Sequence, residues 1–232
     1  MITAVDMAMV AALVGDPARA NILSALTDGR AQTATELTYA ARVSPQTTSG
    51  HLAKLTEARL LSVKKQGRHR YYRLASPLIG RMLEAVMAVA AVAPPRHRSP
   101  SKIDDALRTA RTCYDHLAGR LGVALADALV AQHGIVLGED GGEVTSTGSR
   151  ILTGFGIDLA TAEQQRRTFC RPCLDWSERR PHLAGSIGAA LASRCFELGW
   201  IERQRDSRAV SVTKRGRSGF ADTFNLTLPL ST

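Results

Sequence analysis

The sequence predicts a mainly α-helical fold with small β-hairpins (α+β class), divided into two domains. Three observations lead to this prediction. Apolar residues recur at helical spacing through most of the 232 residues. Short alternating segments separated by turn residues interrupt this pattern at several places. A Pro-rich basic segment divides the chain, so we expect one domain over residues 1–93, a stiff linker over 94–102 and a second domain over 103–232.

Charge is distributed unevenly between these parts. Residues 1–93 carry 11 Lys/Arg against 6 Asp/Glu, whereas residues 103–232 carry 16 against 15. The net charge of +9 therefore belongs mainly to the first domain and the linker, as expected of a surface that binds nucleic acid. The alternative is that these basic residues only make the domain soluble.

The sequence predicts a cytoplasmic protein without a membrane partner. No segment approaches the roughly 18 apolar residues that span a bilayer. The apolar start contains Asp6 and lacks the basic region of a signal peptide. Four cysteines in a chain of this length do not resemble the disulfide framework of a small secreted protein.

The first domain begins with three predicted helices. Residues 4–14 are Ala-rich and helical, and Asp16 can cap a second helix over residues 18–27. Thr33 and a Glu three residues later have the spacing of a capping box, which predicts a short third helix that ends at Ala41.

A fourth helix follows after only three residues, which predicts a helix-turn-helix. Ser44 can cap it, and its first turns carry small polar and amide side chains suited to reading base edges. Glutamine can pair with adenine, a threonine methyl can contact thymine, and His51 and Lys54 can reach phosphate. The DNA contacts expected from this helix are Ser44, Gln46, Thr47, Thr48, Ser49, His51 and Lys54.

A basic β-hairpin wing is predicted directly after this helix. Alternating apolar residues flank the turn Gln66-Gly67-Arg68, and the stretch from Lys54 to Arg73 holds seven basic residues and one acid. Such a hairpin can contact the minor groove or the phosphate backbone. The contacts expected from the wing are Lys64, Lys65, Arg68, His69, Arg70 and Tyr72.

These residues together resemble a known family. The pattern Ser44-x-Gln46-Thr47-x-Ser49-x-His51-Leu52-x-x-Leu55, followed by the wing, is similar to the winged helix of ArsR/SmtB-type bacterial repressors over residues 5–92. The resemblance implies a homodimer that binds a double-stranded DNA operator and leaves it when an inducer binds. Many members sense metals, but the helix before the turn has no Cys here, and the helix over residues 78–92 has no His.

The helix over residues 78–92 predicts a dimer interface. Its apolar stripe is wider than a small winged domain needs on one side, and the first helix has the same excess. The alternative is that both helices belong to the core of a monomer.

The second domain is predicted to be helical with further hairpins. We expect helices over residues 103–132, 147–155, 159–167 and 183–198, and hairpins over residues 135–144 and 200–212. Shifting the sequence by 140 residues sets Glu57-Ala58-Arg59-Leu60-Leu61 against Glu197-Leu198-Gly199-Trp200-Ile201. Residues 182–224 are therefore expected to form a winged-helix-like half that does not bind DNA.

Cys170 and Cys173 form a Cys-x-x-Cys motif, the best candidate for chemistry in the second domain. Two thiols at this spacing can bind zinc or a soft metal or metalloid. A redox switch and two buried, unreactive cysteines are the alternatives. The further metal ligands considered are Asp175, His182, Cys113 and Cys195.

The predicted function is a transcriptional repressor released from its operator by an inducer, and the inducer considered first is a soft metal or metalloid bound at Cys170 and Cys173. The first alternative is the same repressor responding to an organic ligand or to thiol oxidation. The second is an enzyme or metal-carrier domain fused to a DNA-binding head. We expect no enzyme, because no nucleophile elbow, phosphate-binding loop or carboxylate pair is present in the sequence.

Overall fold

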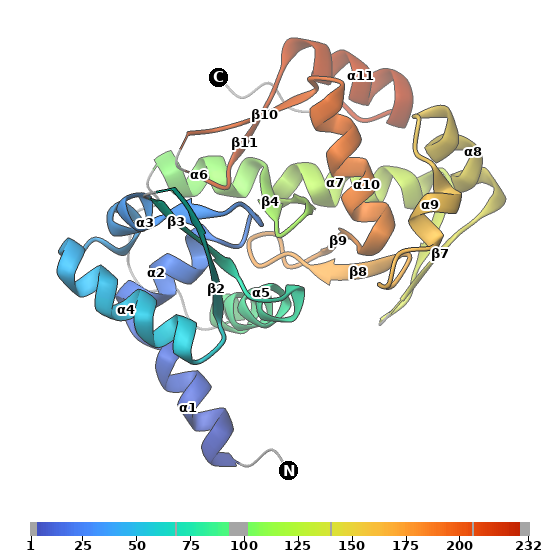
Figure 1. Ribbon diagram of the computed structural model, residues 1–232. Helices are drawn as coiled ribbons and strands as arrows, with labels where there is room; N and C mark the ends of the chain where they lie inside the picture. The colour runs from blue at the N-terminus through green and yellow to red at the C-terminus, as the bar shows by residue number, and fades with distance from the viewer. Residues whose placement is uncertain (1–3, 68, 93–101, 140, 206, 228–232) are drawn as a thin grey trace. The chain divides into compact units, whose positions relative to one another are not determined.

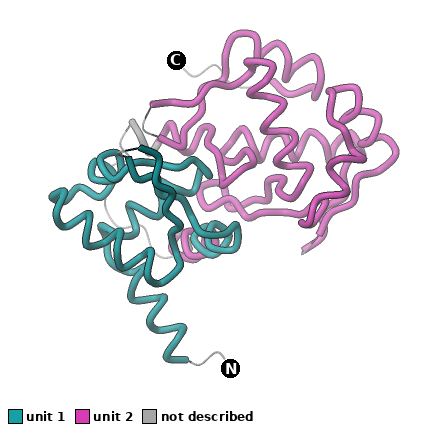
Figure 2. Tube along the Cα trace, in the orientation of Figure 1, with its two compact units in different colours: residues 1–84 teal, residues 85–232 magenta. Residues whose placement is uncertain are grey.

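The computed structural model describes residues 4–67, 69–92, 102–139, 141–205 and 207–227 (Figure 1). The chain divides into two compact units, residues 1–84 and 85–232 (Figure 2). This division falls within the last helix of the first predicted domain, whereas the sequence placed the boundary at residue 93. Apart from Lys102, the predicted linker lies outside the described residues.

The N-terminal part, which we call the head, consists of helices and one small sheet. Its elements in chain order are α1 (Ala4–Val14), α2 (Pro17–Ala25), β1 (Gln32–Thr33), α3 (Ala34–Ala41), α4 (Pro45–Glu57), β2 (Leu61–Gln66), β3 (His69–Leu74) and α5 (Pro77–Val92).

Side-chain caps fix where the helices of the head begin. Asp16 accepts a hydrogen bond from the backbone N–H of Arg19 at 2.9 Å and caps α2. Thr33 and Glu36 form the predicted capping box of α3. Ser44 accepts from the backbone N–H of Thr47 at 3.2 Å and caps α4. The three caps predicted from sequence are therefore confirmed.

The predicted wing is the antiparallel pair of β2 and β3. Its register runs from Leu61 opposite Leu74 to Gln66 opposite His69, and Gly67 adopts φ 59° in the turn. The two-residue strand β1 pairs with β3 and gives the order β1-β3-β2. A strand this short carries no alternating pattern, so the sequence did not reveal it.

The C-terminal unit consists of short hairpins and helices. After the end of α5, its elements are α6 (Lys102–Thr109), β4 (Arg111–Cys113), β5 (His116–Ala118), α7 (Gly119–Ala131), β6 (Ile135–Leu137), β7 (Gly142–Val144), α8 (Ser146–Gly154), α9 (Leu159–Glu163), β8 (Arg171–Leu174), β9 (Pro181–Ala184), α10 (Gly185–Glu197), β10 (Ile201–Arg203), β11 (Val210–Val212) and α11 (Lys214–Phe224).

This unit contains an internal repeat of hairpin, helix, hairpin and helix. The order β4-β5-α7-β6-β7-α8 recurs as β8-β9-α10-β10-β11-α11 (Figure 1). Gly119 and Gly185, with φ 74° and 81°, begin the two equivalent 13-residue helices. Helix α7 packs against β9 of the second repeat, and α10 packs against β5 of the first. The two repeats thus exchange contacts around a common centre.

The prediction of one helix over residues 103–132 was wrong. The chain ends α6 at Thr109, makes the β4–β5 hairpin through Tyr114 at φ 57°, and begins α7 at Gly119. Every residue of β4 and β5 is buried, so these strands lack the alternation that distinguishes a strand from a helix. The hairpin β8–β9 was missed, and α9 ends at Glu163, four residues before the predicted end.

The winged-helix likeness of residues 182–224 stays a prediction. The helix and hairpin expected there are present as α10, β10 and β11. The repeat in the structure relates residues 171–224 to residues 111–154 of the same unit.

An aromatic cluster fills the core of the C-terminal unit. Trp200 lies between Phe155 and Phe220, with ring centroids 5.0 Å from each, and Phe224 packs against the same group. Within the described residues, no helix is both long and apolar enough to cross a membrane.

Candidate nucleic-acid interface and effector sites

The N-terminal half of α4 presents a polar face to solvent. Gln46, Thr47 and Ser49 are exposed there, whereas Leu52 and Leu55 anchor the opposite side of the helix in the core. Short side chains keep the helix backbone close to whatever it approaches, and the Gln46 amide offers both a donor and an acceptor. This face has the chemistry predicted for base reading.

Two residues of the predicted contact set lie inside the head. Thr48 is fully buried, and its hydroxyl donates to the Ser44 carbonyl at 3.0 Å, because it lies on the core side of α4. Tyr72 is 8% exposed, because alternate residues of β3 face the core. Both are therefore removed from the DNA contact set.

The remaining residues predicted on α4 differ in their accessibility. Lys54 is exposed, in the last turn of the helix. His51 is half-buried, and its Nδ1 lies 3.5 Å from a guanidinium nitrogen of Arg19. The Ser44 hydroxyl serves the helix cap, although its side chain remains exposed.

The wing places cations on both strands near its tip. Lys64, Lys65, His69 and Arg70 are exposed, and Lys65 lies directly opposite Arg70 in the ladder. Like charges facing each other across a strand pair repel. Such an arrangement suits a surface that meets a polyanion, which relieves the repulsion. Arg68, also predicted to contact DNA, lies outside the described residues.

Two thiols and two imidazoles meet inside the C-terminal unit. Each of the two hairpins contributes one Cys and one His, which lie opposite each other on its two strands. One ligand atom from each residue lies within 4.8 Å of all the others, and the two sulfurs are 3.9 Å apart. We call these residues the thiol–imidazole cluster: Cys113, His116, Cys173 and His182.

Each histidine of the cluster also lies beside a carboxylate. Nδ1 of His116 is 3.2 Å from Asp115, and Nδ1 of His182 is 3.4 Å from Asp175. Both rings are buried, and within the described part of the chain Nε2 of each ring has no hydrogen-bond partner. Nδ1 of His182 also lacks a hydrogen bond, since its contact with Asp175 is an ion pair only, so the cluster contains three orphaned polar atoms among the described residues.

The cluster is electrostatically polarised. Burial lowers the pKa of His116, but the Asp115 carboxylate and the Cys173 sulfur outweigh it and raise that pKa to about 9. The hydrogen bond with Cys113 and the contacts with the imidazoles lower the pKa of the Cys173 thiol far below its ordinary value, against the effect of burial. Thiolate character thus concentrates on Cys173.

Asp175 is not a ligand of the cluster but the centre of a buried ion pair. Burial opposes its ionisation, yet the contact with His182 and the charge on Arg111 hold its pKa well below the usual range. The Arg111 guanidinium donates to Asp175 at 2.9 Å and stacks 4.4 Å from the ring centre of Trp176.

The Cys-x-x-Cys motif does not form the site that the sequence suggested. The Cys170 and Cys195 side chains belong to the hydrophobic core, where burial raises their pKa to about 11 and about 12. Cys173, Cys113 and His182 do come together. His116 was not among the ligands predicted from sequence. The signal for it is a Cys and a His shortly before a helix, which occurs at Cys113 and His116 before α7 and again at Cys173 and His182 before α10.

Comparisons with known proteins identify the family. The model for a helix-turn-helix domain matches residues 14–64. The HTH-type transcriptional regulator YdfF of Bacillus subtilis (strain 168) is 43% identical over 221 residues, which cover 95% of this chain and 98% of YdfF. The chain belongs to the HTH-type transcriptional regulators.

Solved structures similar to this regulator cover much less of it. The homodimeric winged helix-turn-helix domain of Mb0332 from Mycobacterium bovis, described as a possible ArsR-family regulator, is 26% identical. The match covers 37% of this chain and 78% of the Mb0332 chain, with a TM-score of 0.34. NolR from Sinorhizobium fredii is 24% identical and covers 39% and 89%, with a TM-score of 0.35. The head contains the winged helix that its residues predicted, with α3 and α4 joined by a short turn and followed by the β2–β3 hairpin.

The regulator exposes apolar side chains on two helices. In α1 no residue is buried, and Met7 and Met9 are 70% and 63% exposed. Leu78, Val86 and Val89 of α5 are likewise exposed. Large apolar side chains left exposed on a helix can mark a binding surface. These are the two helices predicted to form the dimer interface.

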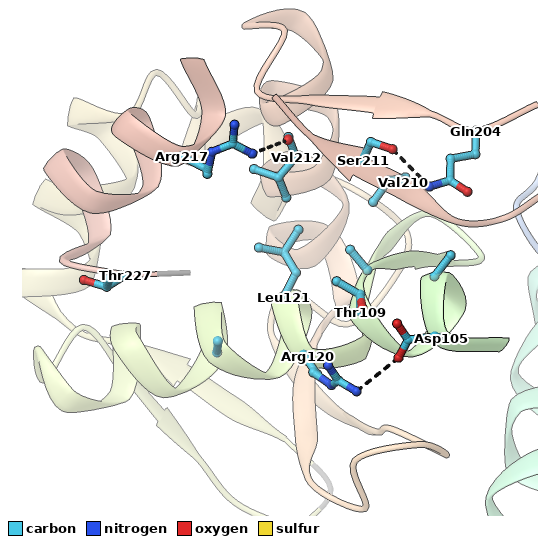
Figure 3. A pocket seen from close by; sticks show the side chains of 13 residues that line it. Asp105, Thr109, Arg120, Leu121, Gln204, Val210, Ser211, Val212, Arg217 and Thr227 are labelled. Carbon is cyan, nitrogen blue, oxygen red and sulfur yellow. Dashed lines mark hydrogen bonds and ion pairs between the residues drawn. The ribbon is translucent and has the colours of Figure 1, made fainter. Parts of the chain in front are cut away.

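The C-terminal unit of the regulator also contains a pocket of about 430 Å³ (Figure 3). Leu121 and Val212 give it apolar walls, while Arg120, Arg217 and Asp105 bring two positive charges and one negative charge to its lining. Arg120 pairs with Asp105 at 3.5 Å, and Arg217 donates to the Val212 carbonyl at 3.2 Å. Its volume lies in the range usual for small-molecule sites.

Proposed function

We propose that this regulator is a homodimeric repressor in the cytoplasm that binds a twofold-symmetric operator and is released by a small-molecule inducer. The observation that carries the proposal is the pairing of an exposed polar face on α4 with a wing whose exposed charges are all basic. The first supplies base contacts and the second supplies phosphate contacts.

A dimer follows from the exposed apolar surface of α1 and α5. One copy presents a single α4, which reads only a few base pairs. Pairing through α1 and α5 would bury the exposed side chains of these helices and present two copies of α4 to successive major grooves. The expected operator is therefore an inverted repeat.

The wing provides the direct test of DNA binding. The double variant Lys65→Gln/Arg70→Gln removes two phosphate contacts per subunit, so a dimer loses about four. Each lost contact makes the negative slope of log K against log salt shallower by about 0.9. The operator is first located by selecting bound fragments from the source genome, and affinity is then measured by fluorescence anisotropy over a range of salt concentrations.

The matched control removes one lysine and one arginine elsewhere. Lys214→Gln/Arg215→Gln changes two exposed residues of α11 and lowers the net charge equally. If both double variants change affinity and salt slope alike, the wing is not the phosphate-binding surface. Gln46→Ala should instead relax the preference at one operator position by about 1–3 kcal/mol.

The pocket favours an organic inducer over a metal inducer. Its apolar walls and the two arginines suit a small organic anion. Cys170 lies in the hydrophobic core and Cys173 in the thiol–imidazole cluster, so the motif that suggested a metal inducer does not form one site. The fluorescent anion 8-anilinonaphthalene-1-sulfonate provides a probe. We expect Arg120→Gln/Arg217→Gln to weaken its binding, and unchanged binding would argue against this site.

An enzymatic C-terminal unit is the rival from another class. The chemistry-bearing residues that the structure brings together are the thiol–imidazole cluster, in which Cys113, His116 and His182 are buried and Cys173 is half-buried. Catalytic metal sites keep one position open for water or substrate. We therefore propose that this unit binds ligands and transmits their presence to the head without catalysing a reaction.

A further inference from the structure

We propose that the thiol–imidazole cluster binds one zinc ion, which holds the two repeats of the C-terminal unit together. The proposal concerns a resident metal and not the inducer, so it does not depend on the repressor function. It keeps Cys173 from the site expected at Cys170 and Cys173, and it takes Cys113 and His182 from the further ligands considered. It replaces Cys170 with His116, and its role is structural.

The ligand types and their spacing fit tetrahedral zinc. Zinc binds thiolate sulfur at about 2.3 Å and imidazole nitrogen at about 2.0–2.1 Å, which places two sulfurs of a tetrahedron about 3.8 Å apart. The Cys113 and Cys173 sulfurs are 3.9 Å apart, and all four ligand atoms lie within 4.8 Å of one another. The side chains are therefore already close to the arrangement that the ion requires.

The orphaned nitrogens supply an independent observation. Buried polar atoms nearly always have a partner, because leaving one unsatisfied costs free energy. Nε2 of His116 and Nε2 of His182 have none among the described residues, and their Nδ1 atoms face Asp115 and Asp175. A carboxylate behind the far nitrogen of a histidine is the usual outer support of a zinc ligand. A bound ion would satisfy both Nε2 atoms.

Charge balance explains how the ion can be accommodated inside the protein. Two thiolates neutralise Zn²⁺, so the filled site has no net charge and avoids the cost of an unpaired buried charge. Mixed sulfur and nitrogen ligands favour zinc over calcium or magnesium, which prefer oxygen. A trivalent metalloid binds most tightly to three thiolates, and this cluster offers two thiols beside two imidazoles. Soft-metalloid sensing at the cluster is therefore not favoured.

The site is built from both halves of the repeat, which gives it a structural role. Each hairpin contributes one Cys and one His, and Gly122 and Gly188 let the helices approach these hairpins closely. A Cβ on Gly122 would lie 3.5 Å from Cβ of His182, and one on Gly188 would lie 3.2 Å from Cβ of His116. The two helices thus fix the histidines of opposite repeats around one centre, and all four positions are taken by protein.

The test uses the full-length protein purified under reducing conditions without chelator. Elemental analysis should find one zinc per chain in the wild type and less than a tenth of that in Cys173→Ser. Cys195→Ala removes a buried thiol from the same unit and should retain one zinc. A wild type that carries no zinc and takes up none on titration would overturn the proposal, as would equal zinc in Cys173→Ser.

A second measurement keeps the proposal testable if Cys173→Ser fails to fold. Replacing the metal of the wild type with Co²⁺ should give thiolate-to-cobalt charge-transfer absorption and the intense visible bands of a tetrahedral site. The weak visible bands of an octahedral ion, with no charge-transfer absorption, would contradict the assigned ligands. Because the ion joins the repeats, a competing chelator should also lower the Tm of the C-terminal unit.

The carboxylate behind His116 provides a finer test of the same geometry. Asp115 positions His116 and also pairs with Arg167. Asp115→Asn should weaken zinc binding about 10- to 100-fold while retaining one site per chain. Arg167→Gln breaks only the other pair and should leave zinc affinity unchanged. Equal effects of the two variants would show that Asp115 does not support a zinc ligand.

Discussion

The buried ion pair of the C-terminal unit should be among its most sensitive positions. Arg111 and Asp175 are both fully buried and their charged groups are 2.9 Å apart. Arg111→Met keeps the apolar stem and removes the cation, which leaves a carboxylate in the interior without its counter-charge. Removing one partner of a buried pair typically costs about 3–5 kcal/mol. We expect about 3 kcal/mol, because the Gly119 and Ser177 N–H groups still donate to the carboxylate.

An exposed pair in the same unit provides the control. The Arg180 guanidinium lies 2.6 Å from Asp127, but the two side chains are 59% and 46% exposed. Solvent screens such a pair, so Arg180→Met should cost less than about 1 kcal/mol. The two substitutions remove the same charged group. Arg111 also donates to the Leu107 carbonyl and the Ser177 hydroxyl and stacks on Trp176, so the difference measures burial together with these contacts.

Urea denaturation at neutral pH, followed by the fluorescence of the two tryptophans, measures both variants. The result that would refute the reasoning is an equal loss of unfolding free energy in Arg111→Met and Arg180→Met. A loss of zinc in Arg111→Met alone would instead show that the pair acts through the adjacent His182, so metal content is measured on the same samples.

The stability difference between wild type and Arg111→Met should depend on pH in a direction set by the pKa of Asp175. The folded pKa of Asp175 lies well below the ordinary value of about 3.9. The stabilisation from its ionised form is therefore complete above that value and is lost as the pH falls towards the folded pKa. The stability difference between wild type and Arg111→Met should accordingly shrink below about pH 4. A difference that grows on acidification would contradict the assignment.

Three further predictions concern packing, capping and assembly. Gly122→Ala should destabilise the C-terminal unit strongly, because its Cβ would lie 2.4 Å from the Leu117 carbonyl oxygen, whereas Gly154→Ala has open space and should be neutral or slightly stabilising by thermal melting. Thr33→Ala removes the capping box of α3 and should cost about 1 kcal/mol in denaturant titrations of the head. Met7→Glu places a charge on the exposed face of α1 and should shift the protein from dimer to monomer in light scattering, and an unchanged mass would exclude this face.

The sequence by itself determined the head. Its caps, the short turn before α4 and the hairpin of the wing are local features, because each depends on residues within a few positions of one another. Asp16, the Thr33–Glu36 pair and Ser44 therefore occupy the predicted cap positions. Thr48 and Tyr72 were assigned to the wrong side, because which side of an element is buried depends on what packs against it.

Only the tertiary structure brings the thiol–imidazole cluster together. Its residues come from two hairpins separated in the chain by α7, β6, β7, α8 and α9, and neither hairpin has an alternating pattern that reveals it. The Cys-x-x-Cys spacing drew attention to Cys170, but that residue precedes β8 and lies in the hydrophobic core. The sulfur next to Cys173 comes from Cys113, 60 residues away. Local sequence specifies caps and turns, whereas a site that joins two repeats exists only once both repeats have folded against each other.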